Sequence, residues 1–222
     1  MKPEELSSAA HDRLIRLYLY LCSLSTDWDN QLQTSEELAE ALDATSVTVR
    51  KDLSLLGCPA DGRGYRTELL REKLNSGLLL TTPVRAGLAG LDSWGAVLIA
   101  QKDLLPGIDI HAGFDSSMNR LEMTRTEIPL YPSYEITEIF RNADLHLGIL
   151  ASDGGKVQQT ADRMIQGGAR GLLNMTSRSL KLPPGIFCCR TYPAEGLLRL
   201  KSLINGFNGI HNEQPPRNRG KQ

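Results

Sequence analysis

Two adjacent cations, Arg50 and Lys51, are the residues of this chain best suited to bind a phosphate backbone or the edge of a base. Around them Val49, Leu53 and Leu56 recur at intervals of four and three residues, which predicts a helix with one apolar, buried face. The cations then lie on the opposite, exposed face, which is typical of a helix that enters the DNA major groove. The DNA contacts predicted from this helix are Ser46, Val47, Arg50, Lys51 and Ser54.

A glycine-rich segment, residues 57–65, follows the predicted helix and has three glycines and one proline in nine positions. This composition is typical of tight turns, and we predict a hairpin with Arg63 at its tip. An arginine at a narrow tip is suited to the minor groove of DNA. Together the two segments predict a recognition helix followed by a wing, with Arg63 as a further DNA contact.

The residues before the recognition helix predict two more helices. Thr34 and Glu37 have the spacing of a capping box, in which a hydroxyl and a carboxylate each bind a free backbone N–H at the start of a helix. A longer helix over about residues 8–24 places Leu14 and Leu21 on one face. Three helices and a wing in about 60 residues indicate a winged helix-turn-helix domain, which we assign to residues 1–80. Without this context, the basic pair could be only the solvated side of an ordinary helix.

The composition indicates a folded protein of two domains. Its 222 residues are 41% hydrophobic, which is enough to bury a sizeable core. No apolar run approaches the roughly 20 residues of a membrane span, and the N-terminus has no signal-peptide pattern, so we expect a cytoplasmic protein without a membrane partner. Because the formal net charge is −1, the basic face is small, and we expect a homodimer that doubles it.

The four cysteines are predicted to be reduced thiols. Cys22, Cys58, Cys188 and Cys189 have neither CxxC nor zinc spacing, which indicates neither a disulfide framework nor a metal site. Adjacent residues of a strand point to opposite faces of the sheet, so we expect either Cys188 or Cys189 to lie in the core.

From Pro83 onward the pattern changes to alternating strands and helices. Repeated units of this length predict a mostly parallel sheet with helices on both faces, the doubly wound or Rossmann-like α/β class, over residues 81–193. The expected strands are 84–89, 108–114, 128–131, 145–151, 171–175 and 186–190, and the expected helices follow residue 95 and cover about 135–141, 157–166 and 194–205.

The C-terminal helix is predicted to bind a second subunit. Leu197, Leu198, Leu200 and Leu203 are too many apolar residues for a helix that stays free in water. We therefore assign residues 194–206 to dimerisation. Residues 207–222, rich in proline and charge, are predicted to be a disordered tail.

The turn at residues 90–95 is a candidate site for the pyrophosphate of a dinucleotide. It joins the first predicted strand to a helix, whose N-terminus attracts phosphate, and Asp115 ends the next strand, where it would bind ribose hydroxyls. However, the middle glycine of the fingerprint is replaced by Asp92. A carboxylate about 5 Å from a phosphate costs roughly 3 kcal/mol per charge at an effective dielectric near 20. The candidate cofactor-binding residues are Gly90, Leu91, Asp92, Ser93, Trp94, Gly95 and Asp115.

Several segments together resemble one known family: residues 49–54, the wing end Gly64-Tyr65, Phe114-Asp115, residues 171–174 and residues 182–185. Over about residues 8–205 the chain resembles Rex, a family of bacterial redox-sensing transcriptional repressors. The resemblance implies a homodimer with a winged-helix domain, a Rossmann domain and a last helix exchanged between subunits. It also implies that NADH releases the operator while NAD⁺ competes.

Carried over by position, the resemblance implies DNA contacts from Arg50, Lys51 and Arg63. It implies pyrophosphate contacts from Gly90 and Gly95 and a ribose contact from Asp115. The chain departs from the family pattern beyond Asp92 as well. The family's asparagine-leucine pair is Ser93-Trp94 here, its valine-proline pair is Ala151-Ser152, and the wing is one residue shorter with one basic residue fewer.

Three functional hypotheses follow. The first is a repressor that binds a near-palindromic double-stranded DNA operator and releases it when NADH binds. The second is a paralogue that binds DNA but has lost the dinucleotide or reads another signal. The third, a Rossmann enzyme, is remote because His111 and His146 are isolated and no catalytic constellation surrounds the glycine turn.

Overall fold

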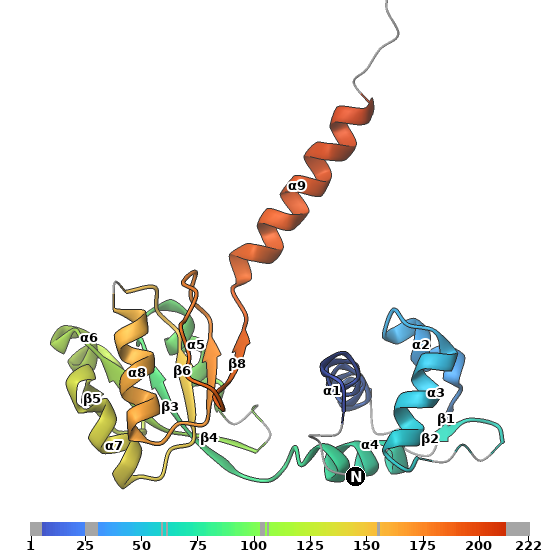
Figure 1. Cartoon of the computed structure of the whole chain (residues 1–222), viewed down its shortest axis with the longest axis horizontal. Helices are drawn as coiled ribbons and strands as arrows, with labels where there is room; N and C mark the ends of the chain where they lie inside the picture. The colour runs from blue at the N-terminus through green and yellow to red at the C-terminus, as the bar shows by residue number, and fades with distance from the viewer. Residues whose placement is uncertain are drawn as a thin grey trace, which may run out of the picture. The chain divides into compact units, whose positions relative to one another are not determined.

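The computed structural model describes residues 6–24, 31–58, 60, 62–102, 105, 107–154 and 156–211. The chain forms two compact units, Met1–Thr82 and Pro83–Gln222. Figure 1 shows the helices of the first unit and the sheet of the second. Among the described residues, no helix is both long and apolar enough to span a membrane.

The first unit is a small helical bundle with one short pair of strands. Its three N-terminal helices begin where a hydroxyl side chain accepts a backbone hydrogen bond: Ser7 from Ala10, Thr34 from Glu37 and Thr45 from Thr48. The capping box of Thr34 and Glu37 is present as predicted. The elements are α1 (Ser8–Ser23), β1 (Leu32–Gln33), α2 (Ser35–Ala41), α3 (Ser46–Leu55), β2 (Tyr65–Arg66) and α4 (Thr67–Leu78).

Helix α4 was not predicted from the sequence. It buries Leu70, Leu74 and Leu78, which recur every four residues, against the core of the first unit. Leucines of α1, including Leu14 and Leu21, belong to the same core, and the helix pair α2–α3 packs against it.

The second unit contains a six-stranded sheet of order β5-β4-β3-β6-β7-β8, in which every pair of neighbours is parallel. This is the doubly wound order, whose ligand crevice lies at the carboxyl ends of the strands where the order reverses, here beside β3. The strands are β3 (Val84–Ala89), β4 (Ile108–Asp115), β5 (Leu130–Pro132), β6 (Leu147–Leu150), β7 (Gly171–Asn174) and β8 (Phe187–Arg190).

Two apolar clusters form the core of the second unit. One includes Phe140 of α7 and Met164 of α8, and the other includes Ile99 of α5. Adjacent residues of β3, Leu88 and Ala89, belong to different clusters, as expected for a sheet buried on both faces. The helices are α5 (Ser93–Ala100), α6 (Met118–Met123), the 3-10 turn η4 (Ser133–Glu135), α7 (Ile136–Asn142), α8 (Val157–Gly167) and α9 (Pro193–His211).

The expectation that Cys188 or Cys189 lies in the core was wrong, because both are exposed. Strand β8 is at the edge of the sheet, and all of its residues are exposed in the single chain. The prediction assumed that at least one face of this strand packs against the core, but in the single chain neither face of β8 is covered.

Helix α9 continues to His211, beyond the predicted end of the helix at about residue 205. No proline interrupts the chain before Pro215, so the local sequence does not stop the helix there. The remainder of the predicted tail, residues 212–222, lies outside the described residues.

Candidate nucleic-acid interface and nucleotide turn

Helix α3 has the two faces that the sequence predicts. Val49 and Leu53 are buried, and Leu56 packs against the same core from the C-terminal end of the helix. The candidate DNA-contacting residues lie on the other side: Val47, Arg50, Lys51 and Ser54 are exposed and Ser46 is half-buried.

Arg50 is held in place by side chains of α2 and of α3 itself. Its Nη1 donates a hydrogen bond to the Ser35 hydroxyl at 3.2 Å, and its Nη2 donates to the Ser46 hydroxyl at 3.4 Å. The Glu36 carboxylate lies 3.8 Å from Nη1. The Arg50 side chain nevertheless remains 52% exposed, so the guanidinium is oriented without being hidden from a ligand.

Helix α3 is fixed to α1 by an ion pair that sequence reasoning missed. Arg13 donates from Nε to Asp52 Oδ2 at 2.7 Å and from Nη2 to Oδ1 at 3.1 Å. The Asp52 side chain is only 6% exposed, and a carboxylate so buried requires such a partner. The hydrogen bond to Asp52 raises the pKa of Arg13. A signal was available, because Asp52 lies within about 60° of Val49 on a helical wheel, at the edge of the buried face.

The glycine-rich segment is joined to the bundle through β2, which pairs antiparallel with β1. The structure describes no strand pair within residues 57–64, of which Pro59 and Asp61 lie outside the described residues, so the predicted hairpin with Arg63 at its tip stays a prediction. Gly64 allows the pairing of β2 with β1, because a Cβ there would lie 2.6 Å from the Gln33 carbonyl oxygen. Arg63 is exposed next to this anchored point.

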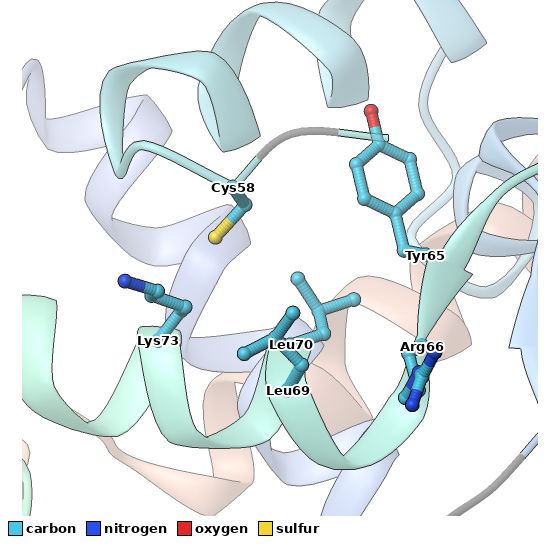
Figure 2. A pocket seen from close by; sticks show the side chains of 6 residues that line it. All are labelled: Cys58, Tyr65, Arg66, Leu69, Leu70 and Lys73. Carbon is cyan, nitrogen blue, oxygen red and sulfur yellow. The ribbon is translucent and has the colours of Figure 1, made fainter. Parts of the chain in front are cut away.

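A small pocket lies beneath this segment, between the end of α3 and α4. Figure 2 shows the Cys58 thiol and the Tyr65 ring above the side chains of α4. Cys58 is buried, and burial raises the pKa of its thiol despite the nearby Lys73 cation. A raised pKa keeps the thiol protonated, and the reactive form of cysteine is the thiolate, so Cys58 contributes to packing and not to chemistry. The pocket lining is Cys58, Tyr65, Arg66, Leu69, Leu70 and Lys73.

The backbone of the nucleotide turn has the close approaches that require glycine. Gly90 has φ +100°, and a Cβ there would lie 2.8 Å from the Ser152 nitrogen. A Cβ at Gly95 would clash with the Gly90 carbonyl oxygen. The turn therefore passes tightly from β3 into α5, with Leu91 buried and Trp94 44% exposed.

Asp92, in the middle of this turn, is the N-cap residue of α5 but makes no side-chain hydrogen bond to the helix backbone. Its Oδ2 instead accepts a hydrogen bond of 2.8 Å from the hydroxyl of Ser152, in the loop after β6. The carboxylate predicted to repel a pyrophosphate thus has a partner within the protein. The side chain of Ser93 lies outside the described residues.

Asp115, at the end of β4, has all of its hydrogen bonds within the protein. Its Oδ2 accepts from the Leu91 backbone N–H and from Arg120 Nε, both at 2.9 Å, and its Oδ1 accepts from the Ser117 N–H at 2.8 Å. Burial would raise the pKa of Asp115, but the hydrogen bonds from Arg120, Leu91 and Ser117 together lower it below its ordinary value. Sequence reasoning found Asp115 and missed Arg120, which α6 places beside it.

The turn fits a dinucleotide in its backbone but not in its side chains. Gly90 and Gly95 provide the tight strand-to-helix connection, whereas Asp92 brings a carboxylate to the middle position and Asp115 is already bound by Arg120. In the described part of the chain no cluster of three or more His, Cys, Asp or Glu side chains could hold a metal ion.

Comparison with known proteins finds extensive similarity to one group. The chain is 30% identical over 190 residues to the redox-sensing transcriptional repressor Rex of Limosilactobacillus reuteri, covering 84% of this chain and 87% of that protein. A Rex repressor of Clostridioides difficile is 25% identical over 203 residues, covering 90% of this chain and 96% of that one. No family model matches the chain.

The fold matches a solved structure of the same group. RSP, a Rex-family repressor, superposes with a TM-score of 0.82 at 23% identity, covering 93% of this chain and 98% of RSP. RSP has also been solved with β-NADH, and with β-NAD⁺ and operator DNA; these structures match with TM-scores of 0.79 and 0.81. The α/β fold with an N-terminal helical region and a six-stranded parallel sheet is therefore the Rex-family fold.

Proposed function

This chain belongs to the Rex family of redox-sensing transcriptional repressors, and we propose that it represses transcription by binding a DNA operator through α3 and the wing. Membership of this family also makes it a non-enzymatic protein, as the sequence predicted. The observation that carries the proposal is the arrangement of α3, which buries Val49 and Leu53 and exposes Arg50 and Lys51. Ser46, Val47, Ser54 and Arg63 are the further proposed contacts.

The proposed DNA interface is small, so the functional form is a homodimer. Apolar side chains on α9 and β8 that are exposed in the single chain support a second subunit as their partner. An exchanged α9 would cover them. A two-fold dimer places two copies of α3 on one DNA face, about one helical turn or a multiple of it apart, and the operator is then near-palindromic. The exposed fractions are 77% for Phe187, 69% for Leu197, 63% for Leu198, 58% for Leu200 and 61% for Leu203.

The domain assignment follows the same proposal. Residues 1–80 bind DNA, residues 81–193 form the sensor and residues 194–206 dimerise. In this scheme NADH binding to the sensor releases the operator and NAD⁺ competes, which the complexes of RSP with β-NADH and with β-NAD⁺ and operator DNA support by analogy.

A second candidate is a DNA-binding paralogue that has lost the dinucleotide or reads another signal. The hydrogen bond between Asp92 and Ser152 and the ion pair between Asp115 and Arg120 favour it, because both would have to be accommodated or broken by a dinucleotide. The two candidates share the DNA-binding function and differ only in the sensor.

One experiment separates them. A gel-shift assay with a near-palindromic operator and the full-length protein is titrated with NADH and, separately, with NAD⁺. Release by NADH at physiological concentrations supports the sensor, and operator binding that is indifferent to both supports the paralogue. If Arg50→Ala and Lys51→Ala both bind the operator as tightly as the unmodified protein, the proposed DNA interface is wrong.

A further inference from the structure

An acidic side chain lies beside one of the two cations of the proposed DNA-binding helix. The Glu36 carboxylate is 3.8 Å from Arg50 Nη1, and both side chains are exposed, Glu36 by 69% and Arg50 by 52%. The Ser35 hydroxyl donates a hydrogen bond of 3.2 Å to Glu36 Oε2, which orients the carboxylate. A surface that binds DNA only through its charge gains nothing from a carboxylate at this place, because the carboxylate repels phosphate.

Glu36 keeps its negative charge at neutral pH. Hydrogen bonds from its own backbone N–H and from the Ser35 hydroxyl lower the pKa of Glu36 below the ordinary value, and the Arg50 charge lowers it further. The carboxylate and the guanidinium together therefore carry almost no net charge. A phosphate that approaches Arg50 meets both groups, so it is attracted much less than by an isolated arginine.

A neutral base edge does not meet this repulsion. The Arg50 guanidinium donates one hydrogen bond from Nη1 to Ser35 and one from Nη2 to Ser46, and these two hydroxyls fix its plane. Its other N–H groups make no hydrogen bond within the described part of the chain. Arginine donors held in one plane match the O6 and N7 acceptors of guanine in the major groove, the commonest specific contact with a base.

The neighbouring cation, Lys51, lies in a different environment. It is exposed, and its ammonium pairs with no acidic side chain among the residues that the structure describes. A lysine ammonium is a compact charge on a flexible stem, which suits a phosphate and does not select a base edge by its geometry. Arg50 and Lys51 are therefore adjacent in sequence but differ in what each binds best.

We propose that Glu36 makes Arg50 a base-reading residue: its carboxylate keeps phosphate away from the guanidinium, which binds a guanine in the major groove, while Lys51 binds the phosphate backbone. Glu36 is then a positioning residue that acts through Arg50. It increases specificity because it weakens binding to every DNA site that offers only phosphates. The inference rests on the proposed function of α3 as the recognition helix and adds which cation reads the sequence.

The test begins with selection from a random duplex DNA pool by the full-length protein, unmodified and as Arg50→Ala, Lys51→Ala and Glu36→Gln. Fluorescence anisotropy then measures the Kd of each form over a series of salt concentrations. The probes are the duplex that the unmodified protein selects and a scrambled duplex of the same composition. Glutamine keeps the size of the side chain at position 36 and removes its charge.

Glu40→Gln is the matched control for the loss of one negative charge. Glu40 is exposed on the same helix, and within the described residues its side chain makes no ion pair or hydrogen bond. The circular dichroism spectrum checks that every variant is folded. A purely structural role of Glu36 would change stability, but neither the selected sequence nor the salt dependence of binding.

Arg50→Ala is expected to lose the preference for guanine at one position of each half-site and to keep the salt dependence of the unmodified protein. Lys51→Ala should keep the selected sequence and flatten the slope of log Kd against log salt by about one for each half-site. Glu36→Gln should tighten binding to the scrambled duplex by about fivefold at low salt, as for one exposed charge about 5 Å from a phosphate. It should leave the selected duplex within about twofold, and Glu40→Gln should leave the ratio of the two Kd values unchanged.

Two results would overturn the inference and leave the DNA interface in place. In the first, Arg50→Ala keeps the guanine preference and flattens the salt slope as Lys51→Ala does. In the second, Glu36→Gln tightens both duplexes equally, so the carboxylate repels DNA without directing Arg50. If the unmodified protein selects no sequence, or if Arg50→Ala and Lys51→Ala both bind as it does, the proposed function fails together with the inference.

Discussion

Replacing Asp92 by glycine is expected to strengthen NADH binding. The carboxylate lies in the middle of the turn between Gly90 and Gly95, where a pyrophosphate would approach the start of α5. At about 5 Å and an effective dielectric near 20, its repulsion amounts to roughly 3 kcal/mol per phosphate charge, a factor of more than a hundred in Kd. The hydrogen bond to Ser152 holds the carboxylate toward the loop after β6, so the observed gain should lie between about tenfold and a hundredfold.

The same substitution should destabilise the fold only slightly. It removes the hydrogen bond from the Ser152 hydroxyl, which contributes about 1 kcal/mol to the free energy of unfolding. Because the Asp92 side chain makes no capping hydrogen bond to α5, glycine at this N-cap position adds only a few tenths of a kcal/mol. A gain in affinity therefore cannot come from a general loosening of the turn.

Calorimetric titration of NADH into the unmodified protein, Asp92→Gly, Asp92→Asn and Ser152→Ala measures each contribution. Asparagine removes the charge and keeps the side chain, so it should give most of the electrostatic gain and none of the steric gain. Ser152→Ala releases the carboxylate without removing it and should not improve binding. If the unmodified protein already binds NADH at micromolar or tighter Kd and Asp92→Gly changes nothing, the carboxylate points away from the phosphates and the reasoning is refuted.

Three further predictions concern the first unit, which we propose binds DNA, and the proposed dimer. Arg50→Ala and Lys51→Ala should each weaken operator binding by about 1–3 kcal/mol in gel-shift titrations; loss of a phosphate contact would also flatten the salt dependence. Arg13→Met should lower the free energy of unfolding in urea by about 3 kcal/mol, because Asp52 stays buried without a partner, and Asp52→Leu in the same chain should recover much of it. Deletion from Ala194 should yield monomers or insoluble protein in size-exclusion chromatography; a truncated dimer with normal operator binding would rule out the α9 interface.

Much of the fold could be predicted from local patterns. The strand β3 has the predicted bounds, and the capping box at Thr34 and Glu37 opens α2 as expected, because both depend on residues close in sequence. Helix α4 was missed although Leu70, Leu74 and Leu78 have helical spacing, because its N-cap is Arg66, which makes no capping hydrogen bond, so the usual signal for the start of a helix is absent. Helix α6 was missed because it is short and buries none of its residues.

Two polar contacts could not be predicted, because they join residues distant in sequence. Arg13 and Asp52 are 39 positions apart, and Asp92 and Ser152 are 60 apart. The sequence identified one member of each pair of the nucleotide turn, Asp92 and Asp115, from its place after a strand. The Ser152 hydroxyl reaches Asp92 because the sheet order brings the ends of β3 and β6 together. Arg120 is only five residues from Asp115 and reaches it from α6, a short helix that the sequence pattern does not reveal.

Two of the departures from the family pattern are physically one change. The half-buried carboxylate of Asp92 needs a hydrogen-bond donor, and the Ser152 hydroxyl supplies it. The family pattern places a proline at position 152, and a proline side chain has no donor. Ser152 also packs against Gly90, where no Cβ fits, so it lies against the turn through both its backbone and its side chain. The hydrogen bond between them thus satisfies both the Asp92 carboxylate and the Ser152 hydroxyl, and neither side chain needs a bound phosphate as its partner. The proposed DNA-binding helix, α3, faces no such requirement, because the polar groups around Arg50 orient its guanidinium and leave it exposed. The proposed operator binding can therefore persist in this chain while the affinity of the nucleotide turn for a dinucleotide changes independently.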